Sequence, residues 1–147
     1  REPFTIQQHA RDMLALMDAL EIPDARVVGL SMGGAVAIEM SLARPGAVAS
    51  LVLANTAPSF RLSSWERRRM AWLRILVASL LGVGAVARIT GRGFFPARGQ
   101  GRLRRRLIRR ASETSRWVSL ATLRALTRWN AEERLAAFGL PLRCARW

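Results

Sequence analysis

The chain has 147 residues, half of them hydrophobic, which suits one folded domain and argues against a disordered protein. A single cysteine and a single histidine exclude an internal disulfide and a metal site of protein ligands, so we expect no metal, no cofactor and a cytoplasmic location. The net charge of +14 is uneven, because residues 1–58 carry a net −2 and residues 59–147 carry a net +16.

The apolar segments are too short to predict a membrane-spanning helix. The longest uncharged run, Ile75 to Ala87, has 13 residues, and a span needs about 20. We interpret it as a buried or partner-facing helix, with an interfacial membrane helix as the alternative. The chain also opens without the pattern of a signal peptide.

The first predicted element is an amphipathic helix. Thr5 is a good N-cap, and Gln8 stands three residues later, as in a capping box. Apolar residues then recur with helical spacing until Pro23, which ends the helix.

Two short apolar runs predict parallel strands at about 26–30 and 48–54. Neither run alternates with polar residues, as expected for strands that are buried on both faces of a parallel sheet. The segment between them, Met32 to Ala43, is rich in Ala and Gly and reads as a helix that stops at "RPG". Strand, helix and strand in this order predict a right-handed βαβ unit and an α/β fold.

The remaining chain reads as mainly helical. We expect a helix from a capping box at Ser63 and Glu66 to about Leu81, breaks at "GVG" (82–84) and "GRG" (91–93), a basic helix over 102–117 and another over 120–129. A β-compatible run at 142–146 indicates the start of a third strand. The predicted organisation is thus a core over 1–58, a helical insertion over 59–138 and a return to the core over 139–147.

A G-x-S-x-G motif lies where the first strand gives way to the helix. In "VVGLSMGG" the serine is Ser31, and it is flanked by Gly29 and Gly33. A serine on a sharp strand-to-helix turn needs small neighbours, which these two glycines provide, while Gly34 keeps the next helical turn slim. The turn would present the Ser31 hydroxyl as a nucleophile, with the backbone N–H of Met32 as an oxyanion donor.

Two other interpretations of the motif remain open at this point. The serine could act only as a helix N-cap, or the glycines could form a phosphate-binding loop. The second is disfavoured, because "GLSMGG" lacks the lysine of a P-loop and the spacing of a dinucleotide loop.

At these residues the chain resembles the α/β-hydrolase fold family. "GLSMGG" looks like the nucleophile elbow of that family, "FTIQQHARDMLALMDALEI" is similar to the helix before the elbow strand, and "VASLVLANTAP" resembles the strand after the elbow helix. The combination looks most like the esterase, enol-lactonase and cofactor-free haloperoxidase members. The resemblance implies that the helical insertion is a cap.

The resemblance also implies a catalytic triad in the order Ser, then Asp or Glu, then His. The single histidine, His9, precedes Ser31, so we expect it to be an ordinary helix residue. The acids after Ser31 all fall on predicted helices: Glu39, Glu66, Glu113, Glu132 and Glu133. We therefore expect a central fragment of a hydrolase, without the family's first strands and its Asp and His, that has little or no activity alone.

The resulting hypothesis is a serine hydrolase that acts on carboxylic esters or lactones, with Trp72, Leu76 and Leu80 in a wall of the acyl pocket. An acyltransferase or a haloperoxidase on the same fold is the alternative. A non-catalytic module that binds nucleic acid or anionic surfaces is the alternative of another class, although a solvated charged face is the commoner fate of such a run. Its candidate residues are Arg102, Arg105, Arg106, Arg109, Arg110 and Arg116.

Overall fold

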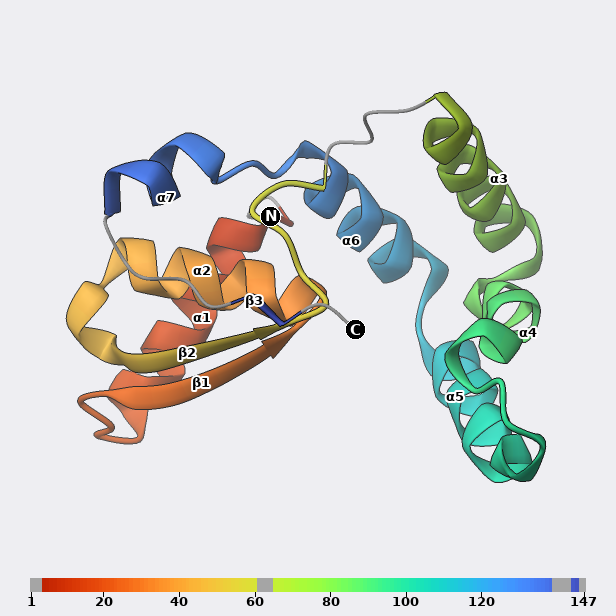
Figure 1. Ribbon diagram of the computed structural model, residues 1–147, viewed down its shortest axis with the longest axis horizontal. Coiled ribbons are helices and arrows are strands. Elements are labelled where there is room, and N and C mark those ends of the chain that lie inside the picture. Colours follow the sequence, from red (N-terminus) through yellow and green to blue (C-terminus); the bar gives the residue numbers. More distant parts are fainter. Residues whose placement is uncertain (1–3, 61–64, 139–143, 146–147) are drawn as a thin grey trace. The chain divides into compact units, whose positions relative to one another are not determined.

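The computed structural model describes residues 4–60, 65–138, 144 and 145 (Figure 1). The chain divides into two units, residues 1–61 with 125–147, and residues 62–124. These limits differ from the predicted insertion of 59–138, because residues 125–138 belong to the first unit.

The first unit is built around parallel strands. Its elements are α1 (Ile6–Ala19), β1 (Ala25–Leu30), α2 (Met32–Ala43), a 3-10 turn (Pro45–Ala47), β2 (Val48–Ala54), the end of α6 (Arg116–Arg128), α7 (Glu132–Phe138) and β3 (Cys144–Ala145). The strand order is β1-β2-β3, and both pairings are parallel. The predicted α/β class is therefore confirmed, and the described part of the third strand, residues 144 and 145, falls within 142–146.

Helix α1 begins with the predicted N-cap but without the capping box. The Thr5 hydroxyl accepts a hydrogen bond from the backbone N–H of Gln8 at 3.1 Å. The Gln8 side chain donates to Asp12 at 2.9 Å instead of reaching back to Thr5. Gln8 can reach Asp12 because Asp12 lies one turn further along the same face of the helix.

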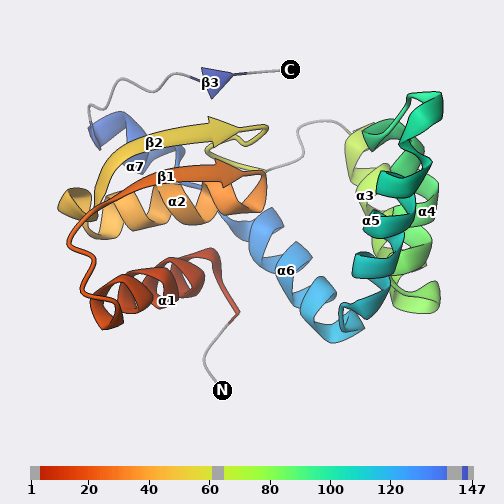
Figure 2. The same cartoon turned by 90° about the horizontal axis from the view of Figure 1, so that it is seen from below.

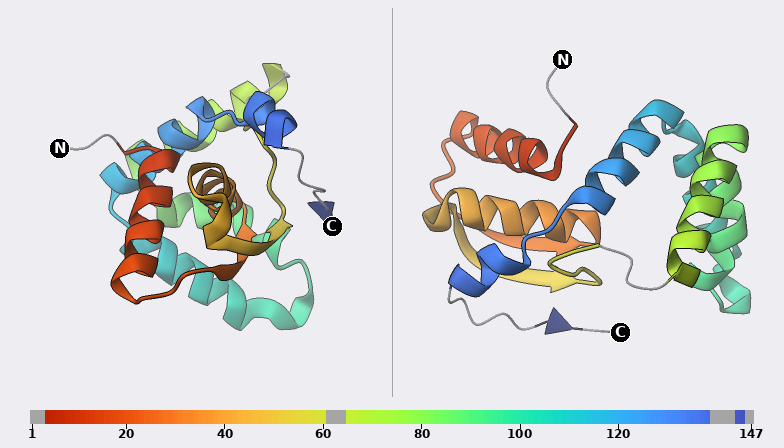
Figure 3. Two further views of the ribbon diagram at one scale, coloured as in Figure 1. Left: turned by 90° about the vertical axis from the view of Figure 1, so that its left-hand side faces the viewer. Right: turned by 90° about the horizontal axis from the view of Figure 1, so that it is seen from above.

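The helices α1 and α2 lie on the same side of β1 and β2 (Figures 2 and 3). One buried cluster lies between the helices and includes Ala10, Leu14, Met17 and Met40. A second cluster joins α2 and β2 to the segment after α6. Its buried members are Ile6, Ala35, Ile38, Leu53, Trp129 and Ala131.

The prediction that the strands are buried on both faces is wrong for the residues that the structure describes. Val28, Leu30 and Val52 are 73%, 66% and 54% exposed. They point away from the side of the sheet that carries α1 and α2, since side chains alternate along a strand. The apolar runs therefore reflect two apolar faces, of which these helices cover one.

The second unit contains α3 (Trp65–Leu81), α4 (Val83–Phe94), a 3-10 turn (Arg98–Gln100), α5 (Gly101–Glu113) and the first part of α6. The first of the two predicted breaks is confirmed, because Gly82 separates α3 from α4, but the second is wrong, because residues 91–93 lie within α4. The basic helix ends at Glu113 rather than 117. The predicted capping box at Ser63 and Glu66 lies outside the residues whose placement is described.

Two glycines of α4, Gly84 and Gly91, lie against side chains of α5. A β-carbon at Gly84 would collide with the Ser112 hydroxyl, and one at Gly91 would lie 3.3 Å from Cγ of Arg104. Gly82 has φ 81° and forms the turn from α3 into α4. Tertiary contact therefore overrides the usual cost of glycine in a helix, about 1 kcal/mol per residue. Along the described helices, none is long and apolar enough to cross a membrane.

Candidate active site

Ser31 occupies a strained turn between β1 and α2. Its φ is 52° and its ψ is −117°, a backbone conformation that residues with a β-carbon rarely adopt. Its N–H donates to the carbonyl of Ala54 at 3.0 Å, which holds the turn at the carboxyl end of the neighbouring strand β2. The sharp strand-to-helix turn that the motif predicts is present.

The Ser31 side chain does not cap the helix that follows it. Its hydroxyl makes no capping bond to α2, and it is partly exposed. The amides of the third and fourth residues of α2 donate to the Ser31 carbonyl instead, from Gly34 at 3.0 Å and Ala35 at 3.4 Å. A serine that served only as an N-cap would use its side-chain oxygen for this, so that alternative is wrong.

The backbone N–H of Met32 lies at the first position of α2. An N–H at this position has no carbonyl one turn earlier in the helix, and it lies at the positive end of the helix dipole. The Met32 side chain packs against the second buried cluster, which fixes the residue on the core. An oxygen that develops negative charge beside Ser31 would find this N–H available.

The backbones of β1 and α2 approach each other closely at Gly29 and Gly34. A β-carbon at Gly29 would lie 2.5 Å from Cα of Gly34, and one at Gly34 would lie 2.5 Å from Cγ2 of Thr56. Gly33 is exposed, and a β-carbon there would meet nothing within 4 Å. The steric reason predicted for Gly33 is therefore wrong, and Gly34 supplies the close approach instead.

Thr56 is a residue of this region that the sequence reasoning missed. It follows β2, as Ser31 follows β1, and its methyl group contacts the backbone of α2 at Gly34. Its hydroxyl oxygen is buried and has no hydrogen bond to the part of the protein that is described. The available signal was a polar residue just after the second strand, where parallel strands place their sites.

A buried carboxylate braces α2 two turns after Ser31. The Glu39 side chain is 5% exposed, and it accepts hydrogen bonds from Gln7 at 3.0 Å, Trp129 Nε1 at 2.6 Å and Arg134 at 2.8 and 2.5 Å. Burial by itself raises the pKa of Glu39, but the hydrogen bonds from Arg134, Trp129 and Gln7 and the Arg134 charge outweigh it. The net effect is a lowered Glu39 pKa, so the carboxylate stays charged.

The other candidate residues lie elsewhere. His9 is on α1, packs edge-on against Phe4 with ring centroids 4.6 Å apart, and has a buried Nε2 without a hydrogen bond to the described residues. Glu113 pairs with Arg110 at 3.2 Å, while Glu132 and Glu133 are exposed in the first turn of α7. The Glu66 side chain is not among those described. Across the described ranges, no group of three or more His, Cys, Asp or Glu could hold a metal ion.

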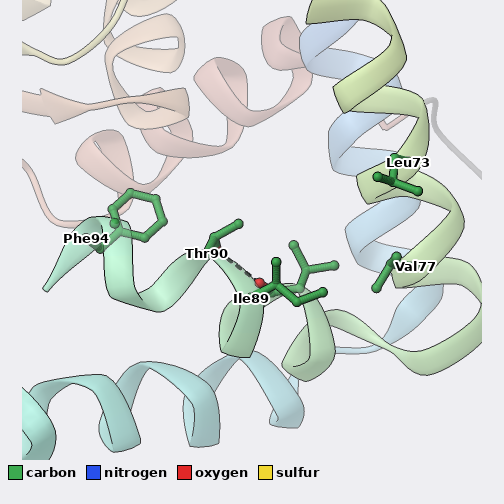
Figure 4. A pocket seen from close by; sticks show the side chains of 7 residues that line it. Leu73, Val77, Ile89, Thr90 and Phe94 are labelled. Carbon is green, nitrogen blue, oxygen red and sulfur yellow. Dashed lines mark hydrogen bonds between the residues drawn. The ribbon is translucent and has the colours of Figure 1, made fainter. Parts of the chain in front are cut away.

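The helical unit contains an apolar hollow of about 490 Å³ between α3 and α4 (Figure 4). Its lining residues are Leu73, Val77, Val86, Ile89, Thr90, Gly93 and Phe94. The Thr90 hydroxyl is already used, because it donates to the Val86 carbonyl at 2.9 Å. Trp72, Leu76 and Leu80, the expected wall residues, are exposed and do not line this hollow.

Most of the arginines proposed for anion binding lie on α5. Those within α5 that are exposed are Arg102, Arg105, Arg106, Arg109 and Arg110. Arg116, also exposed, is the first residue of α6, and one of its N–H groups lies 3.5 Å from the Ser79 carbonyl. The structure therefore places five of these six cations along a single surface helix.

Comparison with known proteins identifies a family. A family model described as the alpha/beta hydrolase fold matches residues 1–130. A protein of Azorhizobium caulinodans provisionally named carbamate hydrolase RutD is 39% identical over 80 residues, which are 52% of this chain and 29% of that protein. A Mycobacterium tuberculosis protein provisionally named non-heme bromoperoxidase BpoC is 46% identical over 55 residues, 37% of this chain and 21% of that one.

A solved structure shows the same arrangement. The enol-lactonase from Burkholderia xenovorans LB400 superimposes with a TM-score of 0.73 at 26% identity, over 88% of this chain and 49% of its own. The chain thus spans about half the length of this relative.

The glycine contacts predict that two neighbouring substitutions change the free energy of unfolding by different amounts. Gly29→Ala should lower the free energy of unfolding by about 1–3 kcal/mol or more, because its β-carbon would overlap Gly34. Gly33→Ala is the matched control and should change stability by less than about 1 kcal/mol, since its site is open and helical. Urea denaturation of the two variants measures both values. Equal losses would contradict the assignment of the close approach to Gly29.

The strain at Ser31 predicts that glycine is more stable there than alanine. Both Ser31→Gly and Ser31→Ala remove the hydroxyl, but only glycine adopts a φ of 52° without strain. We expect the glycine variant to have the higher free energy of unfolding, by about 1 kcal/mol, since strain of about 1–3 kcal/mol is partly offset by glycine's unfolded-state entropy. Thermal and urea unfolding test this order. The reverse order would show that the turn is relaxed.

The lowered pKa of Glu39 predicts a loss of stability in acid. A carboxyl group with a lower pKa in the folded state stabilises it fully above the unfolded-state pKa, near 4.3, and loses this contribution as the pH falls through the folded-state value. The free energy of unfolding should therefore fall more steeply below about pH 4.3 in the wild-type chain than in Glu39→Gln. Identical pH profiles from urea titrations would contradict the assignment.

Proposed function

Because the chain belongs to the α/β-hydrolase fold family, we propose that it is part of a serine hydrolase that uses Ser31 as nucleophile on carboxylic esters or lactones. The observation that carries this proposal is the Ser31 turn, with its positive φ, its hydroxyl unused in capping and its place at the carboxyl end of β1. The named relatives, a carbamate hydrolase and an enol-lactonase, support acyl chemistry as the reaction class.

In the proposed reaction, Ser31 Oγ attacks the carbonyl carbon of the substrate and gives up its proton to a base. The carbonyl oxygen becomes negative and is stabilised by the Met32 N–H at the start of α2. Collapse of this intermediate breaks the bond to the alcohol oxygen, which takes the proton back from the base and leaves as the alcohol, so that an acyl-enzyme and a free base remain. Water, deprotonated by the same base, then releases the acid and restores the serine.

In the part of the chain that the structure describes, no hydrogen bond joins the Ser31 side chain to a histidine or an acid that could act as this base. His9 precedes the nucleophile and packs against Phe4 on α1. Glu39 is committed to Arg134 and Trp129. We therefore infer that these 147 residues alone have little or no esterase activity, and that an acid and a histidine outside them complete the site.

The resemblance to a protein named as a bromoperoxidase supports a second candidate function on the same turn. In this second function, Ser31 would form the same acyl-enzyme. Hydrogen peroxide rather than water would then attack the acyl carbon and release a peracid. Acyl transfer to an alcohol follows the same scheme. The three reactions share the nucleophile and differ in the acceptor that reaches the acyl group.

The nucleophile is tested in a protein that carries this stretch together with its flanking coding sequence. Ser31→Ala should lower hydrolysis of p-nitrophenyl acetate and of a small enol-lactone by about 10³-fold or more. Ser41→Ala is the matched control, because Ser41 is a buried serine of the same helix whose hydroxyl only donates to the Ala37 carbonyl. It should retain activity.

The 147-residue chain by itself should show no turnover above background with the same substrates. Retained activity in Ser31→Ala of the longer protein would exclude Ser31 as the nucleophile. Turnover by the 147-residue chain that disappears in Ser31→Ala would instead contradict the inference that the base lies outside it.

A further inference from the structure

The hydrogen bonds of Glu39 with Gln7, Trp129 and Arg134, called here the Glu39 brace, join segments that are distant in the chain. The donors Trp129 and Arg134 lie 90 and 95 residues further along the chain than Glu39. Burying a charge without partners costs several kcal/mol. Conformations in which Trp129 and Arg134 bond to Glu39 are therefore strongly favoured over conformations in which they do not. The segment of residues 129–135, called here the return segment, is thereby held on α2.

The return segment reaches the part of α2 next to Ser31. Trp129 is 3% exposed and belongs to the buried cluster with Ala35 and Ile38, against which Met32 packs. One indole thus donates to Glu39 and packs in the cluster that supports the first turn of α2. The contact links the brace to the residue whose N–H is the proposed oxyanion donor.

The return segment also holds the loop that follows β2. The N–H of Ala131 donates to the Pro58 carbonyl at 2.8 Å, and Asn130 forms an antiparallel bridge with Ser59. The same loop begins at Thr56, whose side chain contacts Gly34. The first turns of α2 therefore lie between two segments that are fastened to each other.

We propose that Glu39 is a positioning residue for the Ser31 turn, acting through the return segment to fix the backbone of Met32 to Ala35. This inference rests on the proposed role of Ser31 as nucleophile. A displacement of about 1 Å of an oxyanion donor costs an enzyme up to about 10²-fold in rate. A buried ion pair usually adds little net free energy of folding. We therefore assign to the Glu39–Arg134 pair the role of holding these amides in place.

Amide hydrogen exchange in the 147-residue chain tests the proposal without any catalysis. The amides to follow are those of Gly34 and Ala35, which donate to the Ser31 carbonyl. Glu39→Gln keeps the side-chain shape and removes the charge. We expect exchange at these two amides to accelerate at least about tenfold more than at the amides of the last turn of α1, which lies away from Gln7, because the Ser31 turn opens locally.

Asp18→Asn is the matched control. Asp18 also pairs with an arginine, Arg44, at 2.7 Å, but this pair joins α1 to the opposite end of α2. The variant should leave exchange at Gly34 and Ala35 unchanged. If Glu39→Gln does not fold, Arg134→Gln replaces it, because the Arg134 side chain is 45% exposed and the Trp129 bond to Glu39 remains.

Two results would overturn the inference. Uniform acceleration at all core amides would mean that Glu39 contributes only to global stability. Unchanged exchange at Gly34 and Ala35 would mean that the turn is held without the brace. Either result leaves the role of Ser31 intact, whereas retained turnover in Ser31→Ala of the longer protein removes that role without affecting the exchange result.

Discussion

The close approach of β1 to α2 at Gly29 and Gly34 is the constraint on which the candidate site depends. With 2.5 Å between the position of a Gly29 β-carbon and Cα of Gly34, only glycine allows the strand to turn so sharply into the helix. At this sharp turn, Ser31 has a positive φ. The strain in one residue is thus maintained by backbone packing on both sides of it.

The Glu39 carboxylate provides a second, longer-range constraint. It brings Gln7 of α1, Trp129 of the segment after α6 and Arg134 of α7 to one point on α2. Hydrogen bonds to a buried charge are directional and strong, so they define positions that apolar packing alone would leave adjustable. The family match over residues 1–130 includes the Ser31 turn, Glu39 and Trp129.

Much of the first unit follows from local signals. The Thr5 cap, the two parallel strands, the helix between them and the strand–serine–helix order of the elbow were all predictable, because each depends on residues within a few positions of one another. The glycine motif also indicated the strained turn. It did not indicate which glycine of α2 packs against β1 and Thr56. That difference between Gly33 and Gly34 depends on residues outside the motif.

The sequence by itself therefore determined the α/β class and the identity of the candidate nucleophile. The tertiary structure decided that Gly34 rather than Gly33 is packed, that the strands are covered on one face by α1 and α2, and that Gly84 and Gly91 lie within a helix. It also brought Trp129 and Arg134 to Glu39. These features depend on partners that are distant in the chain, and no pattern of neighbouring residues encodes which distant side chain will arrive.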